Sequence, residues 1–363
     1  MVLVPSRTVE LRPKSNYMLI IFPRAQGQQL SGCPTGTLYV SQTDPQAGYG
    51  TINGALAALP NDTSSQIILV GPGSYHEVLN ITRQAPLTLL GITPNPEAWE
   101  TNLVHVWNSS YINQTTQLPT QHNADACVLT IGPYGPGSSD FKMYNIDVAN
   151  RATVNGVEYK LGQTGPSAAL FVTNGNASFY QSTFRSYQDT LYVGQAGNAV
   201  FSGGQVIYGY GKAYFQGTQL ANRGNGGGIV AWKGTAGNNT YGAYFNNSAI
   251  VAATDPEPGV NLTYSCPLGR PWNNMSRAVY MNTYVSDIVL PQGFIQWQPT
   301  NPQFVPNLTI FVESGSYGPG WKPQQRNGTL ESVISPQEAT TRFSVEKVFG
   351  TFPSWVDTNY VYH

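Results

Sequence analysis

Two short segments of the chain combine residues that could perform acid–base and anion chemistry. In the segment SYQDTLYV, Gln188 and Asp189 lie between aromatic residues, in a chain of which only 10% of residues are charged. A carboxyl group placed among aromatic rings is partly desolvated, which raises its pKa and suits it to donate a proton. The amide of Gln188 could donate a hydrogen bond to an oxyanion. The segment therefore predicts a proton donor beside a hydrogen-bond donor.

The second segment, PLGRPWNN, places Arg270 between Gly269 and Pro271, with Trp272 next to them. A guanidinium held by a stiff turn can orient a carboxylate, and an indole face can pack on a sugar ring. Taken alone, either segment is equally compatible with turn residues and core aromatics. A shared site requires a fold that brings Asp189 and Arg270 together.

Other chemistries find little support. The four histidines, His76, His105, His122 and His363, have no spacing typical of metal ligands, so no metal site and no cofactor is expected. The chain has no G-x-S-x-G, P-loop or G-x-G-x-x-G motif. It also lacks the clustered acids of a calcium-dependent lyase or a polygalacturonase. With 18 basic and 19 acidic residues, the net charge of −1 argues against a nucleic-acid partner.

The elements that would position these residues are short strands. The 363 residues include 38 glycines and 26 prolines, and 40% are hydrophobic. This composition favours an all-β chain with many turns and disfavours a helical bundle. No run of about twenty apolar residues is present to span a membrane.

An eight-residue pattern recurs along the chain: Ala, an aromatic residue two positions on, and an apolar residue seven positions on. FKMYNIDV, from Phe141, fits the pattern loosely, and five segments fit it closely: ASFYQSTF from Ala177, AVFSGGQV from Ala199, AYFQGTQL from Ala213, AYFNNSAI from Ala243 and AVYMNTYV from Ala278. The period of two at the start of each segment indicates strands, and units this small bury their apolar faces by stacking. The pattern predicts a parallel β-solenoid. A β-sandwich with recurrent hairpins is the alternative.

One interval between these units is too short to form a complete coil of the solenoid. Successive alanines are 22, 14, 30 and 35 residues apart. Fourteen residues leave little chain for the remaining sides of a coil, because a strand advances about 3.3 Å per residue. The region from Gln205 to Gly209 is therefore expected to lack part of a coil.

The chain carries eleven Asn-x-Ser/Thr sequons, which favour a secreted glycoprotein; abundant Asn, Ser and Thr in β-turns are the alternative explanation. The sequons begin at Asn61, Asn80, Asn108, Asn113, Asn176, Asn238, Asn246, Asn261, Asn274, Asn307 and Asn327. No signal peptide is evident at the N-terminus. Three cysteines, Cys33, Cys127 and Cys266, are too few for a dense disulfide framework.

At these motifs the sequence resembles the pectin methylesterases, or pectinesterases, of the fungal type. The resemblance extends from about Gly36 to Trp321, and its most specific parts are QDTLY and LGRPW in this order. The segments that carry it are GPGSYHE, LTLLG, SFYQSTFRSYQDTLYV, GYGKAYFQ, LGRPW and FVESGSYGPG.

The resemblance implies a right-handed, single-stranded parallel β-helix of one domain and a metal-free aspartyl esterase that releases methanol from methylated galacturonate in pectin. It implies that Asp189 is a general acid and then a base, that Gln188 stabilises an oxyanion and that Arg270 holds the nucleophilic carboxylate. Trp272 would contact the substrate ring. Tyr187, Tyr208 and Tyr210 are expected to bind substrate as well.

The resemblance also implies a secreted monomer that takes part in pectin catabolism and cell-wall modification, without a membrane or nucleic-acid partner. We expect the β-helix domain to span residues 33–335. It would follow an atypical segment at residues 1–32 and precede a tail at residues 336–363 that packs on the helix.

The chain departs from the family in two places. The family's nucleophilic aspartate lies in a G-x-[VT]-D-[FY]-[IL]-[FY]-G turn, but here Val206 runs directly into Ile207 and about six residues are absent. Pro166 occupies the position of the first oxyanion glutamine and cannot donate a hydrogen bond.

Two hypotheses follow. A faulty splice junction removed the turn from the recorded sequence of an esterase, or the protein is a binding β-helix that lost its catalysis. In either case we expect the recorded chain to be feebly active at best.

Overall fold

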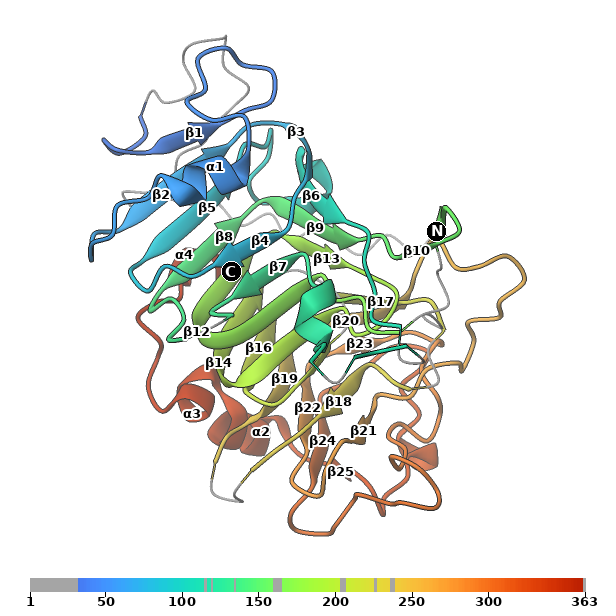
Figure 1. Ribbon diagram of the computed structural model, residues 1–363. Coiled ribbons are helices and arrows are strands. Elements are labelled where there is room, and N and C mark those ends of the chain that lie inside the picture. Colours follow the sequence, from blue (N-terminus) through green and yellow to red (C-terminus); the bar gives the residue numbers. More distant parts are fainter. Residues whose placement is uncertain are drawn as a thin grey trace.

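The computed structural model describes residues 32–113, 116–118, 120–133, 135–158, 165–202, 207–224, 227–235 and 239–361. The expected N-terminal segment, residues 1–32, lies outside this range except for Gly32. Strands dominate the described part, and every ladder of the stack is parallel (Figure 1). The predicted parallel β-helix is confirmed, and the antiparallel hairpins of a β-sandwich are not what pairs these strands.

Parallel ladders of strands form the three faces of the helix. Face 1 contains β4 (Leu79–Ile81), β7 (Leu129–Ile131), β15 (Ile207–Gly209), β18 (Val230–Trp232), β21 (Gly269–Pro271) and the first halves of β12 (Leu170–Tyr180) and β14 (Leu191–Ser202). Face 2 contains the second halves of β12 and β14 together with β1 (Leu38–Val40), β2 (Gln66–Val70), β5 (Leu87–Gly91), β8 (Phe141–Tyr144), β16 (Lys212–Gln216), β19 (Gly242–Asn246), β22 (Arg277–Met281), β24 (Ile310–Ser314) and β25 (Ser332–Val333).

Face 3 is divided into two ladders. The first contains β3 (Gly73–His76), β6 (Val104–Asn108), β9 (Ile146–Asn150) and β13 (Thr183–Arg185), and the second contains β17 (Gln219–Asn222), β20 (Ala249–Ala252) and β23 (Tyr284–Val285). A separate antiparallel hairpin joins β10 (Thr153–Val154) to β11 (Val157–Glu158).

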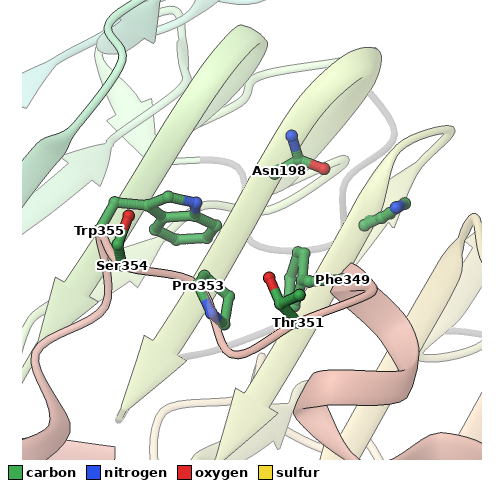
Figure 2. Close-up of a pocket in the computed structure, with 7 residues that line it drawn as sticks. Asn198, Phe349, Thr351, Pro353, Ser354 and Trp355 are labelled. Carbon is green, nitrogen blue, oxygen red and sulfur yellow. The ribbon is translucent and has the colours of Figure 1, made fainter.

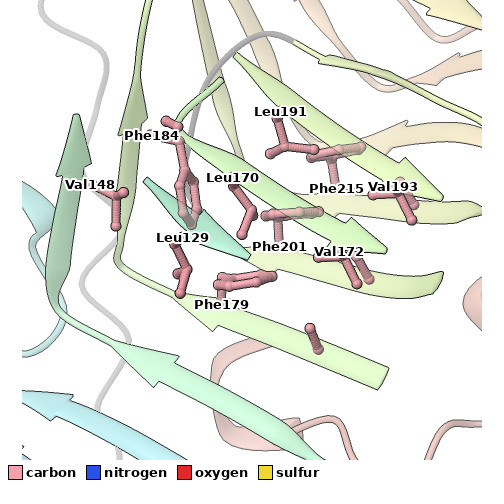
Figure 3. Close-up of a cluster of buried hydrophobic side chains, with 14 of the residues drawn as sticks. Leu129, Val148, Leu170, Val172, Phe179, Phe184, Leu191, Val193, Phe201 and Phe215 are labelled. Atoms are coloured by element: carbon pink, nitrogen blue, oxygen red, sulfur yellow. The ribbon is translucent and has the colours of Figure 1, made fainter. Parts of the chain in front are cut away.

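The recurring octets are consecutive rungs of face 2. Ala177, Ala199, Ala213, Ala243 and Ala278 pair in register and are fully buried. The aromatic residues two positions on also pair in register, and their rings stack with centroids 4.6–4.8 Å apart. Figure 3 shows part of this column, with Phe179, Phe201 and Phe215 in a row inside the helix. Small and large residues at fixed phase therefore pack against one another in register inside the helix.

Most corners between face 2 and face 3 contain one residue with a positive φ. Asn145, Gln181, Asn247 and Asn282 have φ angles of 53°, 47°, 49° and 49°, and Gly217 supplies 62° at the corresponding turn. Asparagine and glycine tolerate this left-handed conformation better than most residues. The polar corners of the octets are thus the turns that redirect the chain.

The ladder of face 3 is interrupted at the 14-residue interval between Ala199 and Ala213. Strand β13 pairs only with β9, and β17 pairs only with β20, so the ladder is interrupted at the coil that holds β14 and β15. Only residues 203–206, which lie outside the described part, separate these two strands in the sequence. Arg223, which follows β17, donates to the carbonyl of Ser186, which follows β13, over 3.2 Å. In the described structure, the coil that holds β14 and β15 therefore contributes no strand to face 3.

Helices cover the first end of the stack and one of its sides. At the first end, α1 (Ile52–Ala57) buries Ile52 and Ala55, and Glu77 accepts hydrogen bonds from the first two amides of the helix. Along the stack, α2 (Pro336–Phe343), α3 (Val345–Phe349) and α4 (Thr358–Val361) pack on the outer side of face 2 (Figure 1).

The remaining helical turns are η1 (Trp99–Thr101), η2 (Asn123–Ala126) and η3 (Pro323–Gln325). Within the described residues, none of the helices has both the length and the apolar character that crossing a bilayer requires.

Candidate active site

A row of outward-facing side chains runs along face 1. The register aligns Phe171, Tyr192, Tyr208, Ala231 and Arg270 across β12, β14, β15, β18 and β21. Residues on either side of this row, such as Leu191 and Val193, point into the core, as the alternation of a strand requires. The parallel stack thus carries residues almost 100 positions apart onto one surface.

Aromatic rings make this row continuous. The ring centroids of Phe171 and Tyr192 are 4.7 Å apart, those of Tyr192 and Tyr208 are 4.9 Å apart, and those of Tyr208 and Trp272 are 6.0 Å apart. The amide of Asn123 donates to the Tyr208 hydroxyl over 3.3 Å. Together the rings give face 1 a surface on which a sugar chain could pack.

Asp189 lies at the entry to β14, where the chain reaches face 1. Its φ of 56° is in the left-handed region, a strained conformation of the kind that concentrates at functional sites. The turn is fixed from behind, because the amide of buried Ser167 donates to the Gln188 carbonyl over 3.1 Å. Burial raises the pKa of Asp189 to about 6, and the positive charge of Arg270 opposes this rise. The carboxyl group can therefore carry a proton in mildly acidic solution.

Arg270 is held by stacking and leaves hydrogen-bond donors available. Its guanidinium carbon lies 4.2 Å from the centroid of the Trp297 ring. Its Nε atom is buried and has no hydrogen-bond partner in the described residues. Burial lowers the pKa of Arg270, and the nearby charge of Asp189 raises it. The two side chains thus lie within electrostatic range, although no direct ion pair between them forms in the described structure.

The other predicted residues divide into two groups. Tyr208 belongs to the row, and Trp272 adjoins it through its contact with the Tyr208 ring. Lys233 links Tyr210 to this group, because its ammonium lies 5.1 Å from the Tyr210 ring and 5.8 Å from the Trp272 ring. Burial, followed by the charge of Asp189, raises the pKa of Tyr208 well above its usual range.

Tyr187 makes different contacts. Its hydroxyl donates to Glu158, and the guanidinium of Arg223 lies 5.2 Å from its ring. The backbone carbonyl of Gln188 accepts hydrogen bonds from Ser167. The side-chain amide of Gln188 makes no hydrogen bond to the described residues.

The sequence after Asp189 offers no acid close by along the chain. Residues 203–206 are outside the described structure, but the sequence contains no Asp or Glu between Asp189 and Asp255. Asp189 is the charged side chain that shifts the pKa of Arg270. Pro166 is present in the described structure and, as a proline, offers no N–H.

Sequence reasoning missed Trp297, Phe171, Tyr192 and Lys233. The alternation in DTLYV, with Tyr192 between two core residues, was a usable signal for Tyr192. No repeat or motif marks Trp297, which reaches Arg270 from a loop. Among the described residues, no group of three histidine, cysteine or acidic side chains comes together as a potential metal site.

The fold and this row define a class: a parallel β-helix protein that presents an acid, a guanidinium and aromatic rings along one face. The chain belongs to the pectinesterase family, whose model matches residues 138–351. It is 30% identical over 345 residues to a probable pectinesterase A of Aspergillus fumigatus, covering 93% of this chain and 94% of that protein.

Solved structures agree with this assignment. The pectin methylesterase of Aspergillus niger, determined in deglycosylated form, superposes with a TM-score of 0.71 at 27% identity, covering 90% of this chain and 98% of that one. A pectin methylesterase in complex with a hexasaccharide shares the fold, with a TM-score of 0.65 at 23% identity over 90% of this chain and 99% of that one.

Proposed function

We propose that this protein is a secreted carboxylic-ester hydrolase that removes methyl groups from esterified galacturonate in pectin and releases methanol. The observation that carries the proposal is the electrostatic pairing of Asp189 with Arg270 on an aromatic face, in a member of the pectinesterase family. Its relatives are named for this activity, and the sequons support a glycosylated, extracellular protein. We further propose that it acts as a monomer.

The side chains can be given roles in this reaction. A nucleophilic carboxylate, which the restored turn would supply, would attack the ester carbonyl carbon; as the tetrahedral oxyanion collapses, protonated Asp189 would donate its proton to the departing methoxide oxygen, so that methanol leaves and an acyl-enzyme anhydride remains. The Asp189 carboxylate would then accept a proton from the water that attacks the acyl carbon. The nucleophilic carboxylate would be released as the leaving group, Asp189 would be protonated again, and the galacturonic acid product would lose its proton to solvent as galacturonate. The donors of Arg270 and the amide of Gln188 would stabilise the negative oxygen, and Trp272 would pack on the sugar ring.

A covalent route needs a carboxylate that the recorded sequence lacks. Removing a covalent nucleophile commonly reduces the rate by orders of magnitude. The proposal therefore includes a segment of about six residues after Val206 that restores the aspartate turn. Without it the chain would bind pectin and turn over slowly.

The test measures methanol release from methylated pectin by three proteins. They are the recorded chain, a chain with the family turn inserted after Val206, and a matched insertion of equal length with Asn in place of its Asp. We expect the aspartate insertion to exceed both others by about a thousandfold or more. Equal, negligible release by all three would contradict the esterase and leave a pectin-binding protein.

Sequencing the cDNA across codons 200–215 tests the origin of the gap. A transcript that encodes the turn supports the faulty junction, whereas an uninterrupted transcript that matches the recorded sequence rejects it.

A further inference from the structure

A pocket of about 240 Å³ lies on face 2, away from the row on face 1. It opens between strands β14 and β16 and the segment that follows α3, as Figure 2 shows. Its lining combines polar and aromatic side chains: Asn198, Lys212, Phe349, Thr351, Pro353, Ser354 and Trp355. It is smaller than the roughly 300–1,000 Å³ of pockets for drug-sized ligands, which suits a single sugar residue.

The fold explains why this pocket is polar. Asn198 and Lys212 pair in register one position before the buried alanines, so their side chains face outward. Two positions further along the same strands, Val200 and Tyr214 are buried beneath the C-terminal helices. The pocket therefore lies at the edge of the part of face 2 that the C-terminal helices cover.

The aromatic wall is held rigidly. Phe349 and Trp355 meet edge to face, with ring centroids 5.5 Å apart. The hydroxyl of Ser178 donates to the Trp355 carbonyl over 3.3 Å, which ties the segment to β12. Gly350, with a φ of 90°, ends α3 and turns the chain toward the pocket.

The polar wall carries an uncompensated positive charge. The ammonium of Lys212 lies 6.0 Å from the Phe349 ring and makes no hydrogen bond or ion pair with the described residues. Burial lowers its pKa, and no carboxylate offsets this effect. Asn198 donates its amide to Asn176 over 3.0 Å, which fixes the orientation of the side chain and leaves its carbonyl oxygen without a described partner.

We propose that this pocket is a second carbohydrate site, which binds one acidic sugar residue of a polyuronate chain independently of face 1. Lys212 pairs with the carboxylate of the sugar, and the rings of Phe349 and Trp355 pack on the sugar ring. The side-chain oxygen of Asn198 accepts a hydrogen bond from a sugar hydroxyl. Because the two sites lie on different faces, the second site would anchor the protein on pectin while face 1 acts elsewhere. The choice of a polyuronate rests on the proposed function, but binding here requires no catalysis.

Affinity for unesterified trigalacturonate tests the site. Calorimetry is performed in an Arg270→Met background, which disables the anion contact on face 1. We expect Lys212→Met to weaken the remaining binding at least tenfold, Lys212→Arg to retain it, and the exposed control Lys347→Met to leave it unchanged. Fully methylated trigalacturonate should bind weakly to all of these proteins. Binding that is unaffected by Lys212→Met, or equal for the methylated trimer, would overturn the proposal.

Chemical footprinting reads the same site without any substitution. Acetylation of each lysine is followed by mass spectrometry with and without trigalacturonate. Protection of Lys212, with Lys347 unprotected, supports the proposal, and unchanged acetylation of Lys212 at saturating trimer rejects it. Both measurements are independent of methanol release, so failure of the esterase proposal would leave their outcome intact.

Discussion

Asp189 and Arg270 each lose hydration on face 1, and each partly offsets that loss for the other. A direct ion pair would consume the donors of Arg270, whereas separation within electrostatic range leaves them available to a ligand. Trp297 makes this possible by supporting the guanidinium without accepting a hydrogen bond. The arrangement thus favours an arginine that binds an external anion.

Replacing Asp189 by Asn should change both activity and pH dependence. The pKa of Asp189 is raised in the folded protein to about 6, from an ordinary value of 3.8. Its contribution to stability is therefore fully present below pH 4 and is lost as the pH rises through 6. We expect Asp189→Asn to be more stable than the parent at pH 8, by on the order of 2 kcal/mol, with little difference at pH 4.

Urea unfolding at the two pH values measures this difference, and Asp287→Asn, at an exposed position, serves as the control. Methanol release by the chain with the inserted turn should fall by at least a hundredfold in Asp189→Asn. Full activity in that variant would remove Asp189 from the reaction.

The sequence predicted Asp189 and Arg270 because their segments match a family motif, and it predicted Trp272 as a neighbour of Arg270. Trp297 could not be found in this way. Its contact with Arg270 depends on where an irregular loop returns to the stack, and loop paths are not encoded in a repeating pattern. Tyr187 lies within the same motif, yet its hydroxyl and ring contact Glu158 and Arg223.

At the scale of elements, the stacked aromatic column should carry much of the stability. Phe215 lies in the middle of it, 2% exposed, with rings of Phe201 and Phe245 stacked on both sides. We expect Phe215→Ala to lower the free energy of unfolding by about 3–5 kcal/mol, because it leaves a cavity between rigid neighbours. Denaturant unfolding measures the loss. Tyr317→Ala, at a side chain that is 56% exposed, should cost far less, and equal costs would contradict a continuous column.

A buried charge cluster closes the far end of the stack. The Nε of Arg326 lies 2.7 Å from Glu313 and 3.6 Å from Glu331, and both carboxylate oxygens of Glu331 are buried without a hydrogen-bond partner. Burial, followed by the charge of Glu313, raises the pKa of Glu331 to about 8. One arginine beside two acids is thus balanced best when Glu331 is protonated.

The sign of the resulting pH dependence follows from the raised pKa. Stability from protonated Glu331 is fully present below about pH 4.5 and is lost as the pH rises through 8. We expect Glu331→Gln to unfold at higher temperature than the parent at pH 9, and the advantage to disappear at pH 5. Thermal melts at both values provide the measurement, with exposed Glu338→Gln as the control. If Glu331→Gln were destabilised equally at pH 5 and pH 9, Glu331 would be charged at both pH values.

The octets allowed the elements of face 2 to be predicted with their register, because alanine and an aromatic residue recur at a fixed phase inside the helix. The 14-residue interval likewise indicated the coil where face 3 is interrupted. The strands of face 1 were less accessible, since coils of different length bring Phe171, Tyr192 and Tyr208 to irregular spacings in the sequence. Pairing across the stack aligns them, and a single sequence contains no direct record of that pairing.

For the whole molecule, the fold separates the sequons that can carry glycan from those that cannot. Asn176 and Asn246 donate their side-chain amides to neighbouring rungs, to Ser139 and Gln216, so attachment would break internal hydrogen bonds. Five others are exposed: Asn61, Asn80, Asn113, Asn261 and Asn307. Glycopeptide mass spectrometry of the secreted protein should find glycan at some of these five and none at Asn176 or Asn246. Occupancy at Asn246 would be incompatible with the amide ladder of face 2.

The interruption of face 3 has a mechanical consequence. Other coils in the interior of the stack pair with their neighbours along three sides, whereas at β14 and β15 the described ladders pair them along only two. A column weakened on one side bends most readily toward or away from that side, and the opposing wall at this level carries Tyr192 and Tyr208. We therefore expect the molecule to behave as two stiff segments joined by a hinge, with flexing of the hinge altering the spacing of the rings against which a sugar chain would lie.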